Sequence, residues 1–218
     1  ISSQTEQDTR RFADFCRIPV FDPSSPEEAY KMIGEAFEYS EKYNTPVLFR
    51  PTTRVCHAYA SIDNCDSPSP KKYEGFVKDS KKWVIFPRLS FANHIMIEKR
   101  NVEIGKDFST YSANKAEGGN SEKVVVTSGI SYAYTKECLK DYPDVKLIKI
   151  ATAYPFPGDF VLSSLEGAKE VLCIEELSPF IEEQILKLAG KHGLQLRVSG
   201  KLDRKVQAGG ENSTDKIA

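Results

Sequence analysis

Apolar residues in the second half of the chain gather in short runs, each of a length that suits a β-strand. Polar, helix-like stretches separate these runs, which lie at residues 124–126, 147–150, 171–174 and 196–198. Short apolar strands that alternate with helices predict a mostly parallel sheet with helices on both faces and right-handed crossovers. We therefore expect a three-layer α/β/α domain at about residues 123–200.

A helix and a strand are predicted between residues 25 and 50. The sequence SPEE at 25–28 suits a helix start, with the serine as N-cap, the proline in the first turn and the second glutamate completing a capping box. Helical spacing of apolar residues then continues until Asn-Thr-Pro ends the helix ahead of a short strand at 47–49. Residues 1–24 offer only a helix and a strand-like stretch, so the sheet of this half-unit is expected to be incomplete.

The regular pattern fades between residues 54 and 120. The stretch 61–75 is rich in Pro, Ser, Asp and Lys, and the stretch 112–123 is rich in Gly, Asn and Ser, as linkers are. Between them a segment around Trp83 carries enough apolar residues to dock on a domain but too few to form one. The end of the chain, from Gln207, also reads as a linker.

Charge and composition exclude several classes of protein. The 30 basic and 31 acidic residues nearly cancel, and no basic run with interleaved aromatic residues points to nucleic acid. No apolar run approaches the roughly 20 residues that span a bilayer, and the start has no signal-peptide pattern, so we expect no membrane and a cytoplasmic protein. The five cysteines have no C-x-x-C spacing, which predicts reduced, mostly structural thiols.

Motifs with possible chemistry are sparse. Ser128-Gly129 joins a strand to a helix, where an anion can bind, but a single glycine without a phosphate-binding pattern favours a plain turn. Cys56 and His57 are expected in an extended segment, where neighbours point to opposite faces, so a Cys–His nucleophile pair is not favoured. His94 and His192 have no second metal-type ligand nearby.

The sequence EELSPFIEEQ, residues 175–184, contains four glutamates. Glu175 and Glu176 follow a predicted strand, so they face the crevice or a neighbouring domain. Glu182 and Glu183 fall in the first turn of a predicted helix, where the helix dipole favours negative charge, and Glu183 is expected to pair with Lys187 four residues on. The cluster is therefore interpreted as a strand–helix joint rather than a catalytic centre.

Five segments together resemble one family. SSQTEQDTR, RPTTRVCHA, TSGISYAY, YPFP and EELSPFIEEQ occur in the order found in the large (alpha) subunit of indolepyruvate ferredoxin oxidoreductase. The resemblance extends along essentially the whole chain. It also indicates a broader relation to 2-oxoacid ferredoxin oxidoreductases and a likeness of the C-terminal domain to the transketolase C-terminal domain.

This resemblance implies an enzyme that oxidatively decarboxylates aryl pyruvates such as indolepyruvate, with coenzyme A, to the acyl-CoA. Thiamine diphosphate with Mg²⁺ supplies the carbanion chemistry in the family, and 4Fe-4S clusters pass electrons to ferredoxin. The implied partners are a small (beta) subunit of the same enzyme, a second large subunit, ferredoxin, coenzyme A and the aryl pyruvate.

The same resemblance implies that the chain is an internal segment. Residues 1–57 would finish a pyrimidine-binding thiamine domain, 58–122 would connect, 123–200 would form the transketolase-C-like domain and 201–218 would lead to a missing domain. The family's G-D-G motif and clustered cysteines do not occur in this sequence. We expect no catalytic, cofactor-binding or metal-binding residue here, and no activity from the segment alone.

The expected contribution is at the rim of the active site or at an interface. Ile1 stands where the family commonly has a histidine. The candidate rim or interface residues are Gln4, Glu6, Gln7, Asp8, Arg10, Arg50, Arg54, His57, Glu175 and Glu176. Two alternatives stay open, namely a stand-alone interaction or regulatory module of transketolase-C-like fold and a nucleotide-binding enzyme that uses the turn at 128–129.

Overall fold

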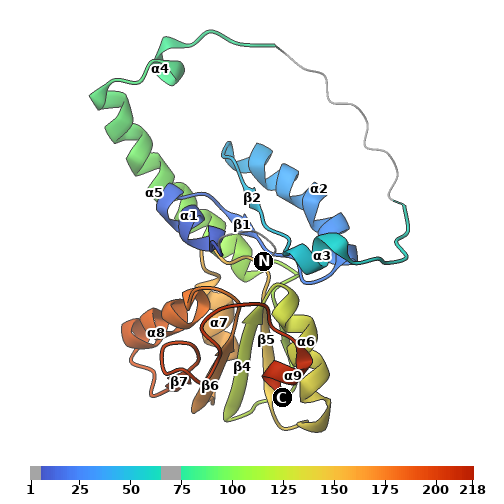
Figure 1. The fold of residues 1–218 in the computed structure, drawn as a ribbon. Coiled ribbons are helices and arrows are strands. Elements are labelled where there is room, and N and C mark those ends of the chain that lie inside the picture. The colour runs from blue at the N-terminus through green and yellow to red at the C-terminus, as the bar shows by residue number, and fades with distance from the viewer. Residues whose placement is uncertain (1–5, 65–74) are drawn as a thin grey trace.

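The structure is a computed structural model that describes residues 6–64 and 75–218. Its N-terminal part carries a two-stranded parallel sheet, and its C-terminal part carries a five-stranded sheet (Figure 1). The elements before the second sheet are α1 (Thr9–Cys16), β1 (Val20–Phe21), α2 (Pro26–Tyr43), β2 (Leu48–Phe49), α3 (Thr53–His57), α4 (Ser80–Trp83) and α5 (Pro87–Ser109).

The capping box predicted for α2 is present in a modified form. Ser25 Oγ accepts a hydrogen bond from the Glu28 N–H at 3.2 Å, and Pro26 occupies the first turn. The Glu28 carboxylate reaches back one residue further than expected, to the N–H and hydroxyl of Ser24. Asn44 in the left-handed region ends the helix, as the sequence indicates.

The helix α5 runs for 23 residues through the segment that the sequence predicted as a connection. Its C-terminal half is buried at Asn101, Ile104 and Phe108, whereas its N-terminal half extends away from the molecule and carries α4 at its far end (Figure 1). The helix passes so close to the loop after β5 that a Cβ on Gly105 would lie 3.6 Å from Cβ of Pro155.

The C-terminal sheet has the strand order β3-β5-β4-β6-β7. β5, β4, β6 and β7 are parallel, and β3 joins the edge antiparallel to β5. Helices α7 and α8 lie on one side of the sheet and α6 and α9 on the other (Figure 1). The elements are β3 (Lys115–Glu117), β4 (Lys123–Ser128), α6 (Ile130–Cys138), the 3-10 helix η1 (Leu139–Asp141), β5 (Lys146–Ile150), α7 (Gly158–Ser164), β6 (Glu170–Ile174), α8 (Phe180–His192), β7 (Arg197–Ser199) and α9 (Thr214–Ile217).

The predicted α/β class with a mostly parallel, helix-covered sheet is confirmed. The edge strand β3 lies within the 58–122 range, so the sheet begins earlier in the chain than the predicted boundary at 123. Residues 201–218 also differ from the expected linker. They fold back on the sheet, where Val206 and Ile217 pack against the cluster around Val125 and Asn212 is buried.

The two parts share one core and backbone hydrogen bonds. The N–H groups of Val20 and Asp22 donate to the carbonyls of Tyr154 and Ala151 at 2.7 and 2.8 Å. Ala13 and Val20 belong to the same buried cluster as the strands β4, β5 and β6. The N-terminal part is thereby fixed at the carboxyl ends of the C-terminal strands. None of the helices in the described residues has the length and apolar character to cross a membrane.

Candidate functional site: a buried ion network between the two parts

Charged side chains from distant segments meet where the N-terminal part contacts the carboxyl ends of β4 and β6. We call this group the seam site. Its members are Asp8, Arg10, Asp22, Arg50, Ser128, Glu175 and Glu176. In open α/β sheets this edge of the sheet is the usual position of ligand sites.

Arg10 is the centre of the seam site, with a side chain that is only 1% exposed. Asp8 Oδ1 and Oδ2 accept from its Nε and Nη2 at 2.9 and 2.7 Å, in a bidentate pair. Its Nη1 donates to Glu175 Oε2 at 2.7 Å, and its Nη2 donates to the carbonyls of Glu176 and Ser178 at 2.8 and 3.1 Å. One guanidinium thus ties α1 to the joint between β6 and α8.

Glu175 is held from the other side by α8. Its two oxygens accept the backbone N–H groups of Ile181 and Glu182 at 2.9 and 3.0 Å, in the first turn of the helix. Burial raises the pKa of Glu175, against the opposing effects of Arg10 and of these two donors. Burial acts to lower the pKa of Arg10, but the carboxylates of Glu175 and Asp8 outweigh it, and the pKa is raised.

Glu176 binds the C-terminal segment. Its Oε1 accepts the N–H of Asn212 at 2.8 Å, and the Asn212 amide donates to Ser131 Oγ on α6 at 2.9 Å. Burial raises the pKa of Glu176, whereas the bond from Asn212 acts to lower it. The segment between β6 and α8 is therefore hydrogen-bonded to residues near both ends of the described chain, Arg10 and Asn212.

Asp22 and Arg50 form a second buried ion pair at the seam. Arg50 Nη1 donates to Asp22 Oδ1 at 3.0 Å, and the Asp22 side chain is 0% exposed. Burial raises the pKa of Asp22, in spite of Arg50 and Arg10. Gly129, at φ 52°, begins α6 directly against this carboxylate, since a Cβ there would lie 3.0 Å from Asp22 Oδ1.

The remaining candidates lie further out. Glu6 accepts the N–H of Gly210 at 3.1 Å, Arg54 pairs with Glu211 at 2.7 Å, and Gln7 and His57 are exposed. Gln4 lies outside the described residues. The structure thus brings Asp8, Arg10, Arg50, Glu175 and Glu176 together and leaves the other described candidates near the surface.

Two local predictions about Cys56 and Glu183 are wrong. Cys56 and His57 belong to the short helix α3, which Thr52 caps, and not to an extended segment. Glu183 pairs with Arg11, whose two terminal nitrogens donate to its two oxygens at 2.6 Å, because α1 lies beside the start of α8. Glu183 and Lys187 do not form an ion pair.

Glu182 and Asp22 were missed. Glu182 is 2% exposed, and its Oε2 accepts the N–H groups of Lys201 and Leu202 at 2.8 and 3.0 Å, so it fixes the turn after β7. Nothing in the first turn of a helix signals such a long-range contact. Asp22 did carry a signal, because it follows a predicted strand directly, as Glu175 does.

The carboxylates and guanidinium groups of the seam site are bonded mainly to one another and to backbone groups. Within the described residues each of its carboxylates has at least one cationic or N–H partner, and one buried oxygen, Asp22 Oδ2, has none. The same part of the chain contains no group of three His, Cys, Asp or Glu side chains arranged to hold a metal ion.

Comparisons with known proteins agree with the expected resemblance. Over 208 residues the chain is 37% identical to indolepyruvate oxidoreductase subunit IorA of Thermococcus kodakarensis and 36% identical to the same subunit of Pyrococcus horikoshii. Each alignment covers 92% of this chain and 32% of the relative, so the chain spans about a third of the relatives' length. No family model matches the chain.

A solved structure shares the fold. The 2-oxoglutarate:ferredoxin oxidoreductase of Magnetococcus marinus aligns with a TM-score of 0.54 at 13% identity, over 84% of this chain and 38% of that protein. Since the identity is low, this likeness speaks for the fold alone. The IorA alignments confirm the resemblance to a subunit of indolepyruvate oxidoreductase, and the solved structure agrees with the predicted fold class.

Proposed function

We propose that this chain is an internal segment of a thiamine diphosphate-dependent cytoplasmic oxidoreductase that decarboxylates aryl pyruvates to acyl-CoA and passes electrons to ferredoxin. Its similarity to about a third of IorA supports this assignment. Within the enzyme the segment supplies scaffold and interface rather than catalytic groups. The observation that carries this role is Arg10, which is buried and bonded to both Asp8 and Glu175, as a permanent joint requires.

The residues of the described chain do not fit the family's cofactors. Mg²⁺ in a thiamine site needs oxygen ligands that are free to bind it, but both oxygens of Asp8 and of Glu175 are already bonded. An iron–sulfur cluster needs four clustered thiolates. The four described cysteines lie in four different elements, α1, α3, α6 and β6, and Cys173 is buried in the core. These groups therefore belong to other parts of the proposed enzyme.

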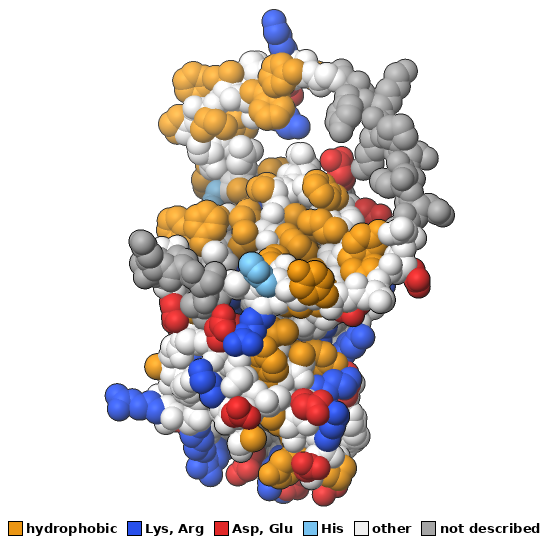
Figure 2. All heavy atoms as spheres, turned by 45° about the vertical axis from the view of Figure 1, so that its right-hand side comes forward, with side chains coloured by type: hydrophobic (Ala, Val, Ile, Leu, Met, Phe, Trp, Pro, Cys, Tyr) orange, Lys and Arg blue, Asp and Glu red, His pale blue; other side chains and the backbone are white. Residues whose placement is uncertain are grey.

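The uneven distribution of exposed apolar side chains supports the interface role. Among the described residues twenty large apolar side chains are exposed, of which seventeen lie between Phe12 and Val102 and three lie beyond residue 109. Figure 2 shows the hydrophobic side chains gathered over the upper part of the molecule, with mostly charged and polar groups below. A large exposed apolar surface marks an interaction site. The proposed partners are the rest of the large subunit, a second large subunit and the small (beta) subunit, with ferredoxin as electron acceptor.

The proposal is tested by exchanging a segment of a related enzyme for this chain. The segment of Thermococcus kodakarensis IorA that aligns with this chain is replaced by this chain, and CoA-dependent reduction of ferredoxin by indolepyruvate is measured in the assembled enzyme. Retained activity supports a scaffold role. A chimera that assembles with its cofactors bound but has lost activity contradicts it, because a scaffold contributes no catalytic group.

Calorimetry of the isolated chain gives a second, independent result. We expect no Mg²⁺-dependent binding of thiamine diphosphate, with the complete IorA enzyme as positive control. Micromolar binding that requires Mg²⁺ would show that the segment carries cofactor contacts after all.

A further inference from the structure

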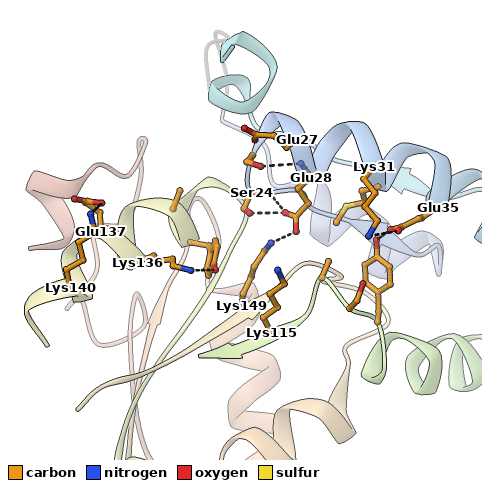
Figure 3. Close-up of a pocket in the computed structure, with 17 residues that line it drawn as sticks. Ser24, Glu27, Glu28, Lys31, Glu35, Lys115, Lys136, Glu137, Lys140 and Lys149 are labelled. Atoms are coloured by element: carbon orange, nitrogen blue, oxygen red, sulfur yellow. Dashed lines mark hydrogen bonds and ion pairs between the residues drawn. The ribbon is translucent and has the colours of Figure 1, made fainter. Parts of the chain in front are cut away.

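A groove of about 620 Å³ lies between the N-terminal part and the C-terminal sheet, away from the seam site's ion pairs. It is lined by the start of α2, the loop after α5, β3, β5 and α6 (Figure 3). Its volume falls within the range of pockets that bind small molecules. The role proposed above does not use this groove.

Lysines from several elements converge on the groove. They are Lys31, Lys115, Lys136, Lys140 and Lys149. Four of the five have a carboxylate partner. The pairs are Lys31 with Glu35 at 3.7 Å, Lys136 with Glu117 at 2.8 Å, Lys140 with Glu137 at 2.6 Å, and Lys149 with Glu28. Among the described residues, no ion pair or hydrogen bond is recorded for the Lys115 ammonium.

Lys115 and Lys149 are neighbours on adjacent strands. The antiparallel register of β3 and β5 places these two residues directly opposite each other. Like charges at such positions repel. The Lys149 side chain is 3% exposed, and burial lowers its pKa, while Glu28 acts to raise it and Lys115 to lower it further. Glu28 is bonded to Lys149, while Asp22 acts on Lys149 and Glu117 on Lys115 from further away, so Lys115 is the member of this pair that forms no ion pair of its own with a described residue.

The nearby carboxylates have their own partners. Glu28 also accepts from the N–H and hydroxyl of Ser24, at 2.7 and 2.8 Å. Glu35 accepts from the Tyr111 hydroxyl as well as from Lys31. Glu27, which also lines the groove, is hydrogen-bonded to the Ser25 side chain. Because the Lys115 ammonium forms no ion pair with a described residue, an anion that enters beside it displaces no partner of Lys115.

Aromatic and apolar side chains line the space next to the two lysines. Lys149 Nζ lies 4.8 Å and Lys136 Nζ 5.5 Å from the centre of the Tyr132 ring. Met32 and Ala113 also face the groove. A wall of this kind suits the organic part of a ligand, and lysine ammonium groups suit a phosphate.

We propose that this groove binds a small phosphate ester, with its phosphate beside Lys115 and Lys149 and its organic part against Tyr132. The phosphate would meet the Lys115 ammonium, which forms no ion pair with a described residue.

Calorimetric titration of the purified protein with phenyl phosphate, in the absence of Mg²⁺, tests the site. We expect saturable binding that the exposed substitution Lys115→Glu weakens at least ten-fold. Lys123→Glu is the matched control, because Lys123 is also an exposed lysine that forms no ion pair with a described residue, and it lies on β4, which β5 separates from β3. It should change the affinity less than two-fold.

Two further titrations separate the parts of the ligand. Tyr132→Ala should weaken phenyl phosphate more than three-fold and leave inorganic phosphate within two-fold. Benzoate should bind at least ten-fold more weakly than phenyl phosphate. Absence of saturable binding, equal losses in the Lys115 and Lys123 variants, or equal affinity for benzoate would each overturn the proposal. Because no titration contains Mg²⁺ or thiamine, these outcomes do not depend on the proposed enzyme function.

Discussion

Arg10 holds two carboxylates that have no other cation within hydrogen-bonding distance in the described chain. Replacement by methionine leaves Asp8 and Glu175 buried without their counter-ion, since both side chains are at most 3% exposed. We expect Arg10→Met to lower the free energy of unfolding by about 3–5 kcal/mol. Urea unfolding followed by circular dichroism measures this loss.

Arg11→Met is the matched control for Arg10→Met. Both guanidinium groups lie over the ring of Phe180, at 5.5 and 5.4 Å, but Arg11 is 39% exposed and pairs with the half-exposed Glu183. An exposed pair contributes about 0–1 kcal/mol. Equal losses in the two variants would contradict the importance of burial at the seam site.

Asp22 predicts a dependence of stability on pH. Its pKa is raised from the ordinary value of 3.8, so between 3.8 and the folded-state pKa the folded protein binds more protons than the unfolded chain. Stability from this group is therefore lost as pH rises through that window. Asp22→Asn removes this titrating carboxyl, so the variant should gain stability relative to the parent above about pH 4. The gain should be about 1.4 kcal/mol for each pH unit by which the folded-state pKa of Asp22 exceeds its ordinary value.

Urea titrations at several pH values between about 4 and 8 measure the slope. A parent that gains stability relative to Asp22→Asn as pH rises would mean that Arg50 outweighs burial and lowers the pKa of Asp22.

At this scale the sequence singled out several of the side chains that meet, as rim or interface candidates, but it did not predict that they contact one another. Asp8, Arg10, Glu175 and Glu176 were placed near an interface from the family resemblance and from their positions after strands. Nothing in the local sequence indicates that Arg10 is buried, because a contact across 165 positions depends on the tertiary fold. Their role at an interface of a larger enzyme stays a prediction.

The turn after β7 depends on the absence of a side chain at Gly200. A Cβ there would lie 2.7 Å from Glu182 Oε2 and 3.0 Å from the Cys173 carbonyl oxygen. Gly200→Ala should therefore displace Glu182 from the N–H groups of Lys201 and Leu202 and cost about 1–3 kcal/mol. Thermal unfolding measures the change.

Gly190→Ala tests the same substitution without the clash. Gly190 lies inside α8, and a Cβ there meets nothing within 4 Å. Alanine is a better helix former than glycine by about 1 kcal/mol, so this variant should be more stable than the parent. A destabilised Gly190→Ala, or an unchanged Gly200→Ala, would contradict the local geometry.

Elements with local signals were predictable, and elements fixed by distant contacts were not. The capping sequence and helical spacing predicted α2, and apolar runs predicted β4, β5 and β6. The edge strand β3 escaped notice because its sequence, Lys-Ala-Glu, has no strand propensity and pairs through its backbone with β5. The sequence did not predict a helix as long as α5, because the apolar residues of this helix are spread around its circumference rather than along one face.

The uneven distribution of apolar surface predicts where a hydrophobic dye binds. Phe37 and Phe91 are 69% and 70% exposed in the N-terminal half, and Leu202 is 53% exposed in the C-terminal part. We expect the double variant Phe37→Ser, Phe91→Ser to remove roughly half of the fluorescence of bound anilinonaphthalene sulfonate, because the dye binds exposed apolar surface and most of that surface lies in this half.

Leu202→Ser is the control, since it removes an isolated exposed apolar side chain. It should leave the fluorescence nearly unchanged. A larger loss with Leu202→Ser than with the double variant would place the apolar patch in the wrong half of the molecule.

The contact between Arg10 and Glu175 also sets an order of events during synthesis. The two residues are 165 positions apart, and Glu175 further requires the first turn of α8 to supply its N–H donors. When Arg10 leaves the ribosome, Glu175, Glu176 and Ser178 have not been made, and closing so long a loop costs entropy that must be offset by contacts formed afterwards. The C-terminal sheet is therefore expected to fold first, with the N-terminal segment docking last. Until then the N-terminal part leaves apolar side chains such as Ala13 and Val20, which are buried in the finished fold, uncovered, the state in which chaperones bind.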